Sequence, residues 1–138
     1  MPIVWTPDLA TGSSQIDGQH LRLFQLFNDL DEAVGRLQGE GVVGRTLNAL
    51  SVYVVAHFRM EEELMRQWAF PGLEAHLKDH RAMRLQVEAM VDQYHAVGLD
   101  PTQVLRAMKR WLIGHVQNED KAMAQFLVAA QTRALSTN

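Results

Sequence analysis

The stretch LNALSVYVVAHFRMEEEL, residues 47–64, repeats its core-type positions in alternating steps of three and four residues. That spacing predicts a helix that buries one face, because 3.6 residues make one turn. The repeating positions are Leu47, Leu50, Val54, His57, Glu61 and Leu64. Since His57 and Glu61 are polar, the stretch predicts a helix over about 42–67 that carries an imidazole and a carboxylate into the core.

Three further segments show the same periodicity, and stretches containing glycine or proline separate the segments from one another. Together they predict helices over about residues 17–38, 42–67, 73–95 and 101–131. Because short connections force consecutive helices to run in opposite directions, we expect an all-α fold, an antiparallel up-down-up-down four-helix bundle. Residues 1–16 lack the periodicity and are expected to form an irregular N-terminal arm of a single domain, 1–138.

Composition narrows the classes of function. The 138 residues are 47% hydrophobic, enough for one core, and the formal net charge of -3 offers no basic surface for nucleic acid. There is no cysteine, which excludes disulfides, iron–sulfur clusters and thiolate-ligated zinc, so any metal must be held by histidine and carboxylate. No apolar run is long enough to span a bilayer, and we expect no membrane insertion and a cytoplasmic location.

Histidines occupy core positions in all four predicted helices. Counted along each helix from the bundle end that holds the first and third connections, they and Glu61 fall in one slab roughly 20 to 29 Å from that end. The members of this cluster are His20, His57, Glu61, His76, His80 and His115. A single buried histidine is usually a hydrogen-bonded core residue. Burying this whole cluster without compensation would cost several kcal/mol per group, so we interpret it as a metal site.

Nitrogen and oxygen ligands without sulfur suit Fe, Zn, Mn or Cu. With a second carboxylate the ligands are too many for one ion, and we expect a dinuclear iron centre, bridged by both carboxylates and a solvent-derived oxygen, with one open position. Spacing leaves the second carboxylate undecided. Glu119 comes four residues after His115 and shares its face on an ideal helix, whereas Asp120, one residue further on, would need a local distortion.

Four segments resemble the ligand segments of hemerythrins, and the resemblance runs from Trp5 to about Met123. The segments are IDGQH (16–20), HFRMEE (57–62), HLKDH (76–80) and WLIGHVQNED (111–120). The resemblance implies that one iron is held by His76, His80 and His115 and that the open iron is held by His20 and His57. It also implies that Glu61 and Asp120 bridge the two, which selects Asp120 over Glu119. Single-domain bacterial members are the most similar.

By the same resemblance, the cofactor is two Fe ions, Fe2+ or Fe3+, with a bridging oxo or hydroxo group, and the ligand is O2. We therefore expect reversible O2 binding for oxygen storage, delivery or transport, and not an enzyme. An alternative is an O2 or iron sensor that acts through a partner protein. A di-iron oxidase or peroxidase is less expected, because such bundles use a Glu-x-x-His motif that this sequence lacks.

Reversible O2 binding requires apolar side chains that keep water away from the bound oxygen, and we call these side chains the apolar wall. The candidates lie near a predicted ligand in the sequence or match pocket positions of the family, and they are Trp5, Leu23, Phe58, Trp111, Leu112 and Val116. Among the remaining polar residues, Glu62 and Glu63 are expected to be solvated. Asp17 is expected to cap the first helix.

Overall fold

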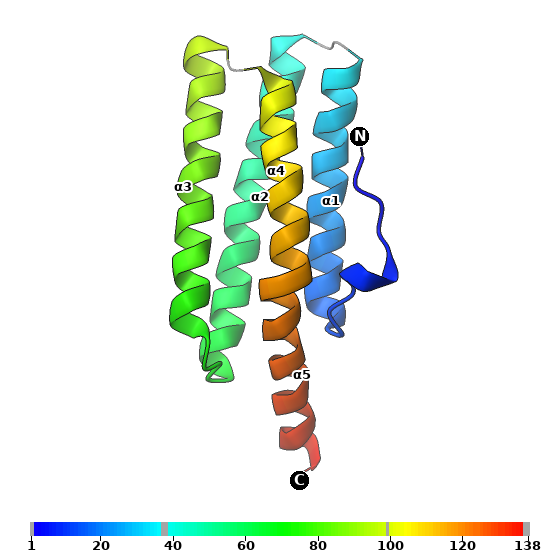
Figure 1. Ribbon diagram of the computed structural model, residues 1–138, viewed down its shortest axis with the longest axis vertical. Coiled ribbons are helices and arrows are strands. Elements are labelled where there is room, and N and C mark those ends of the chain that lie inside the picture. Colours follow the sequence, from blue (N-terminus) through cyan, green and yellow to red (C-terminus); the bar gives the residue numbers. More distant parts are fainter. Residues whose placement is uncertain (1, 37–38, 99, 137–138) are drawn as a thin grey trace.

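The structure, a computed structural model, describes residues 2–36, 39–98 and 100–136. Within these residues the chain forms helices and no strand, and the long helices alternate in direction, up, down, up and down (Figure 1). Their bounds are α1 Ser14–Gly35, α2 Glu40–Gln67, α3 Leu73–Val97 and α4 Pro101–His115, which continues through η2 Val116–Asp120 into α5 Lys121–Ser136. The predicted all-α, antiparallel four-helix bundle is confirmed.

The start of α1 differs from the prediction. The helix begins at Ser14 rather than near residue 17, and the Ser13 side chain caps it by accepting a hydrogen bond from the Ile16 amide at 3.3 Å. Asp17 is not the cap. Its Oδ1 accepts hydrogen bonds from the amide of Thr11 at 2.9 Å and from the Thr11 hydroxyl at 2.7 Å, which ties the preceding arm to the first turn of the helix.

Local residue chemistry explains the turn between α3 and α4. Gly98 ends α3 with φ 71°, a left-handed conformation that glycine adopts without a Cβ clash. Asp100 then caps α4 by accepting a hydrogen bond from the Thr102 amide at 3.0 Å, and Pro101 occupies the first helical position, where its missing N–H costs nothing. The expected end of the first helix at residue 38 lies outside the described residues.

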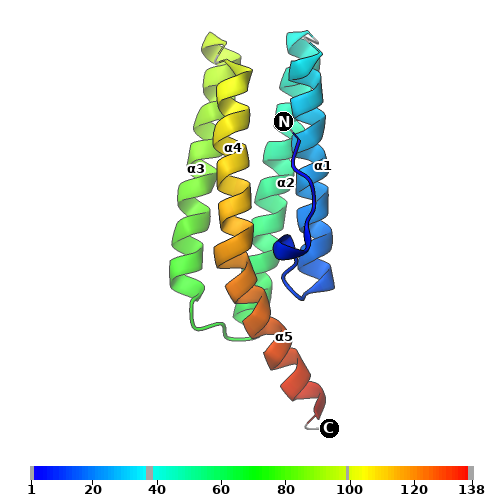
Figure 2. The same ribbon diagram turned by 45° about the vertical axis from the view of Figure 1, so that its right-hand side comes forward.

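The N-terminal arm runs back along α1 (Figures 1 and 2) and contains one short 3-10 turn, η1 Pro7–Leu9. Ile3 and Leu9 are buried against the bundle. Asn28 of α1 holds the arm through two hydrogen bonds, accepting from the Ile3 amide at 2.7 Å and donating to the Ile3 carbonyl at 2.9 Å. The arm therefore covers the bundle rather than hanging free of it.

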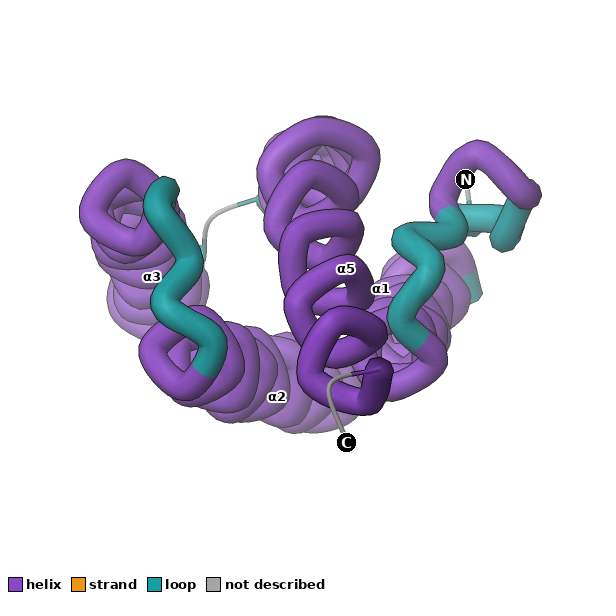
Figure 3. Tube along the Cα trace, turned by 90° about the horizontal axis from the view of Figure 1, so that it is seen from below, coloured by secondary structure: helices purple, strands orange, loops and turns teal. Residues whose placement is uncertain are grey.

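The last helical segment is not the single uniform helix predicted for about 101–131. A π-helical turn, Val116–Asp120, separates α4 from α5. Beyond this turn α5 continues past the lower end of the bundle, and seen from below it leans across that end over α2 (Figures 1 and 3). The π turn matters for function because it changes which residues face the interior.

Two apolar clusters fill the bundle interior. The larger one includes Leu23, Leu50 and Leu112 and reaches the histidine level, where its member Phe58 stacks on His80. The smaller one, at the α2–α3 connection end, consists of Ile16, Met65, Met123, Ala124 and Leu127. The polar residues of the interior lie between these clusters, so apolar packing shields them above and below. In the described part of the chain, no helix is both long and apolar enough to cross a membrane.

Candidate metal centre

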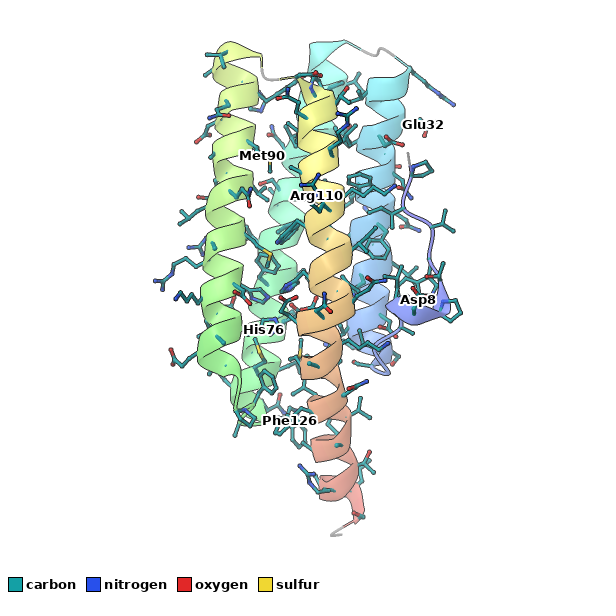
Figure 4. All side chains as sticks on the ribbon, in the orientation of Figure 1. Asp8, Glu32, His76, Met90, Arg110 and Phe126 are labelled. Atoms are coloured by element: carbon teal, nitrogen blue, oxygen red, sulfur yellow. The ribbon has the colours of Figure 1, made fainter. Side chains whose placement is uncertain are left out.

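Every helix of the bundle contributes to one buried polar cluster. The contributions are His20 from α1, His57 and Glu61 from α2, His76 and His80 from α3, His115 from α4 and Asp120 from the π turn. Figure 4 labels His76 at this level, between α3 and the lower part of α4. His20, Glu61 and Asp120 are fully buried, and none of the imidazole residues exceeds 6% exposure. All seven residues predicted from the sequence thus come together in the interior.

Three imidazoles lie on one side of the cluster and face one oxygen of each carboxylate. Asp120 Oδ1 is 2.8 Å from His115 Nε2 and 3.2 Å from His76 Nε2. Glu61 Oε1 is 3.2 Å from His80 Nε2 and 4.0 Å from His76 Nε2. These five residues each offer a ligand atom, and the atoms lie within 4.8 Å of one another.

Two imidazoles lie on the other side and face the remaining oxygens. Asp120 Oδ2 is 2.8 Å from His20 Nε2, and Glu61 Oε2 is 3.4 Å from His57 Nε2. The ligand atoms of this second group are also within 4.8 Å of one another. Each carboxylate therefore directs one oxygen to either side, which is the arrangement that two ions bridged by the same two carboxylates require.

Most ring nitrogens and carboxylate oxygens at the centre of the cluster have no well-formed hydrogen bond within the protein, although unlike groups lie close together; His20 Nε2 and Asp120 Oδ2, 2.8 Å apart, are a pair that does form one. Among the described residues, the unpaired atoms at its centre are His57 Nε2, His76 Nε2, His80 Nε2, His115 Nε2, both oxygens of Glu61 and Asp120 Oδ1. Leaving such an atom unpaired costs about 1–3 kcal/mol. All of them belong to the two groups above, so a cation in each group would satisfy them together, and the residues fit a pair of metal ions.

When no metal is bound, protons on the imidazoles neutralise part of the negative charge of Glu61 and Asp120. Burial alone would lower the pKa of His57, but the charges and hydrogen bonds of Glu61 and Asp120 outweigh burial and raise that pKa to about 9. Burial and the neighbouring Asp120 would raise the pKa of Glu61, yet His57 and His20 lower it to about 2. Both carboxylates therefore stay negatively charged, and protonated imidazoles neutralise them in place of metal cations.

The structure also shows which of the two carboxylates after His115, Glu119 or Asp120, faces the cluster. Asp120 is fully buried with Oδ1 2.8 Å from His115 Nε2, whereas the Glu119 side chain is 43% exposed and approaches the other ring nitrogen, Nδ1, at 3.6 Å. The π turn adds a residue to one helical turn and so brings the fifth residue onto the inner face. Asn118 supports the turn by donating its Nδ2 hydrogen to the Gly114 carbonyl at 2.8 Å.

Glu62 is not the solvated residue expected from the sequence. Its side chain is only 22% exposed, and its Oε2 accepts a hydrogen bond from His80 Nδ1 at 2.9 Å. Carboxylates in this position orient a metal-binding imidazole and raise its basicity. The prediction that Glu62 is solvated was wrong because its partner, His80, lies on a different helix. The spacing of residues within α2 or within α3 cannot indicate a contact between the two helices.

Gln19 supports His57 as Glu62 supports His80, and the spacing of the sequence gives no signal of this contact. The Gln19 side-chain oxygen accepts a hydrogen bond from His57 Nδ1 at 2.8 Å. The two sides of the cluster therefore differ: a charged acceptor supports His80 and a neutral one supports His57. Asp17 and Asp79 lie close in the sequence to His20 and His80, but within the described residues neither has a hydrogen bond to an imidazole.

Two of the aromatic residues predicted to surround the bound oxygen, Phe58 and Trp111, pack against imidazoles of the cluster. Phe58 stacks on His80 with ring centroids 4.0 Å apart and an interplanar angle of 10°. Trp111 lies nearly parallel to His115 at 6.0 Å and meets the edge of Phe58 at 5.7 Å. The aliphatic members Leu23, Leu112 and Val116 are at most 2% exposed. Trp5 is half-buried and contacts Phe24, with ring centroids 5.9 Å apart.

Comparison with known proteins identifies the family to which this geometry belongs. The family model for the hemerythrin HHE cation binding domain matches residues 11–127. The chain belongs to the hemerythrin family. The match includes both imidazole groups and both carboxylates, and it agrees with the resemblance drawn from the four ligand segments. Hemerythrins bind O2 at a non-haem di-iron centre, and this chain holds a cluster of histidine, glutamate and aspartate that could bind such metal ions.

Individual hemerythrins are similar over most of the chain. A bacteriohemerythrin from Stenotrophomonas maltophilia is 34% identical over 123 residues, which cover 88% of this chain and 79% of that protein. A bacteriohemerythrin from Methylococcus capsulatus is 27% identical over 129 residues, 92% of this chain and 98% of that one. A crystal structure of wild-type hemerythrin superimposes with a TM-score of 0.84 at 27% identity, covering 91% of this chain and 97% of the other.

Proposed function

We propose that this chain binds O2 reversibly at its own di-iron centre and serves oxygen storage, delivery or transport. The observation that carries the proposal is the unequal division of the buried cluster into a group with three imidazoles and a group with two, both sharing the same carboxylates. The ion held by fewer protein ligands keeps a coordination position for a small molecule. A pair of ferrous ions would supply the electrons with which O2 is bound.

The protein residues have separate tasks in this proposal. His76, His80 and His115 would hold one ion, His20 and His57 would hold the other, and Glu61 and Asp120 would each contribute to both. The hydrogen bonds from His80 to Glu62 and from His57 to Gln19 fix the ring tautomers, so that each Nε2 faces the metal. These two contacts set the orientation of the imidazoles before any ligand arrives.

The apolar wall favours binding over turnover. Phe58, Leu112 and Val116 are each at most 4% exposed, and their side chains carry no proton donor. A site closed in this way would exclude water and proton donors, which is the condition for releasing O2 unchanged. We infer that the chain does not turn over a substrate, and that Leu23, Trp111 and Trp5 complete the enclosure.

The proposal is tested by metal analysis together with optical spectra recorded under air and after removal of oxygen. We expect a pair of iron ions per chain and a visible band that appears and disappears reversibly. His115→Ala should abolish both. The matched control is His95→Ala, because His95 is exposed and hydrogen bonds to Asn48 far from the cluster. A single iron, an irreversible band or steady oxygen consumption by the iron-loaded chain would contradict the proposal.

A further inference from the structure

A surface cleft of about 210 Å³ lies between α2 and α3, outside the buried cluster. Charged side chains dominate its rim: Arg59, Arg66 and Glu62 come from α2, and Arg81 and Arg84 come from α3. Its remaining walls are formed by Val55, Phe58, Leu77 and His80. The cleft is thus a small hollow with a cationic mouth, an apolar base and one imidazole.

The arginines of the cleft are poorly neutralised by the protein. In the part of the chain that the structure describes, no carboxylate lies within ion-pair distance of Arg59, Arg66 or Arg81. Arg84 has only a long contact with Glu88, 3.8 Å between Nε and Oε1, and both of these side chains are about half exposed. On a chain of net charge -3, this concentration of cations in one hollow is repulsive unless an anion relieves it.

Glu62, the single carboxylate of the rim, is already engaged elsewhere. Its Oε2 accepts the hydrogen bond from His80 Nδ1 at 2.9 Å, on the inner side of the cleft. The negative charge of Glu62 is therefore directed at the imidazole and leaves the guanidinium groups available. The arrangement differs from an ordinary solvated helix face, where acidic and basic side chains alternate and pair.

We propose that this cleft is a binding site for a phosphate group, either as inorganic phosphate or pyrophosphate or as the end of a small phosphate ester. The planar guanidinium fork matches two phosphate oxygens at once, and a phosphate near neutral pH carries a charge of about -1.5 to -2, which suits several cations. The volume is smaller than the roughly 300 Å³ at which drug-sized ligands begin to fit, so the group that enters is a phosphate and not a whole nucleotide.

The site does not depend on iron, because its charged groups are arginines on the outside of the bundle. Its position nevertheless places the bound anion beside Glu62 and His80, the contact that orients one imidazole of the metal cluster. Failure of the phosphate site would leave the proposed oxygen binding untouched, and the reverse is also true.

The test is a calorimetric titration of the full metal-free chain with inorganic phosphate, pyrophosphate and glycerol phosphate, each at low ionic strength. We expect saturable binding of one anion per chain, and the probe that binds most tightly distinguishes free phosphate from an ester. Arg81→Gln and Arg59→Gln should each weaken binding about tenfold, because each removes a charge-assisted hydrogen bond. Arg81→Lys, which keeps the charge but loses the fork, should recover part of the affinity.

Two matched controls separate a site from general electrostatics. Arg133→Gln makes the same change of charge at an exposed position on α5 and should leave the affinity unchanged. Glu62→Gln should tighten binding, because it removes the one negative charge of the rim, whereas Glu63→Gln, an exposed neighbour outside the cleft, should not. Circular dichroism of each variant shows that the helices are intact.

Three results would overturn the proposal. The first is the absence of saturable binding by the unmodified chain with all three probes, a measurement that requires no variant. The second is an equal loss of affinity in Arg133→Gln and Arg81→Gln, which would indicate charge alone. The third is capture of an acidic protein on this face by a chain that binds none of the small phosphates.

Discussion

His115 and Asp120 are five residues apart in the chain, yet His115 Nε2 and Asp120 Oδ1 lie 2.8 Å apart in the interior. In a regular α-helix the residue four positions on would share the face of His115, and that residue is Glu119. The π turn Val116–Asp120 reverses the choice, turning Asp120 inward and leaving Glu119 at the rim. Single-turn π segments of this kind occur often at functional sites, because they place one side chain where the regular helix cannot.

We expect Asp120→Asn to remove metal from the protein and Glu119→Gln to leave it bound. Asp120 directs its two oxygens to both imidazole groups, so its neutralisation weakens both ion positions. The loss of iron affinity should exceed the about 10–100-fold that changes beyond the direct ligands typically produce. Iron content after gel filtration measures the effect. Equal iron retention by the two variants would contradict the assignment of Asp120.

We expect Glu62→Gln to weaken iron retention by about 10–100-fold, because the His80 imidazole loses its charged acceptor while keeping a neutral one. The rate of iron release to a chelator measures this effect. Glu63→Gln serves as control, since Glu63 is the exposed neighbour on the same helix and the change of charge is identical. Similar release rates in the two variants would show that Glu62 does not support His80.

Much of the cluster could be predicted because helical periodicity reports which face of each helix is buried. His57 and Glu61 replace apolar residues at positions where Leu50 and Val54 establish the inner face, and the structure buries all four. Periodicity assumes a regular helix, so it could not choose Asp120, which depends on the π turn; the family resemblance made that choice. The role of Glu62 could not be predicted for a different reason. Its hydrogen bond with His80 depends on how α2 and α3 are rotated against each other.

We expect Leu112→Ala to accelerate autoxidation of the oxygenated protein. Leu112 is 2% exposed within the larger apolar cluster, and its truncation leaves a cavity next to polar groups, the condition under which water enters. Stability should fall by roughly 2–5 kcal/mol. The control is Leu127→Ala, equally buried but in the smaller cluster beyond the metal level, which should lose similar stability without faster decay of the oxygenated band. Equal decay rates in the two variants would show that Leu112 does not keep water away from the bound oxygen.

Metal removal should make stability strongly dependent on pH. The pKa of Glu61 is lowered from 4.5 to about 2 in the metal-free fold, so its contribution is complete above 4.5 and is lost as the pH falls through 2. The pKa of His57 is raised from 6.5 to about 9, so its contribution is complete below 6.5 and is lost as the pH rises through 9. The metal-free chain should therefore be most stable between these two windows.

The alkaline side gives the sharper measurement. A shift of the His57 pKa from 6.5 to about 9 corresponds to about 3 kcal/mol, which urea unfolding of the metal-free chain should show as a loss between mildly acidic and alkaline buffer. His95→Gln, which changes an exposed imidazole, should retain the loss. The metal-loaded chain should not show it, because cations rather than protons then neutralise Glu61 and Asp120, and their binding strengthens as the imidazoles lose protons. A metal-free chain equally stable in both buffers would mean that protonated imidazoles do not substitute for the metal.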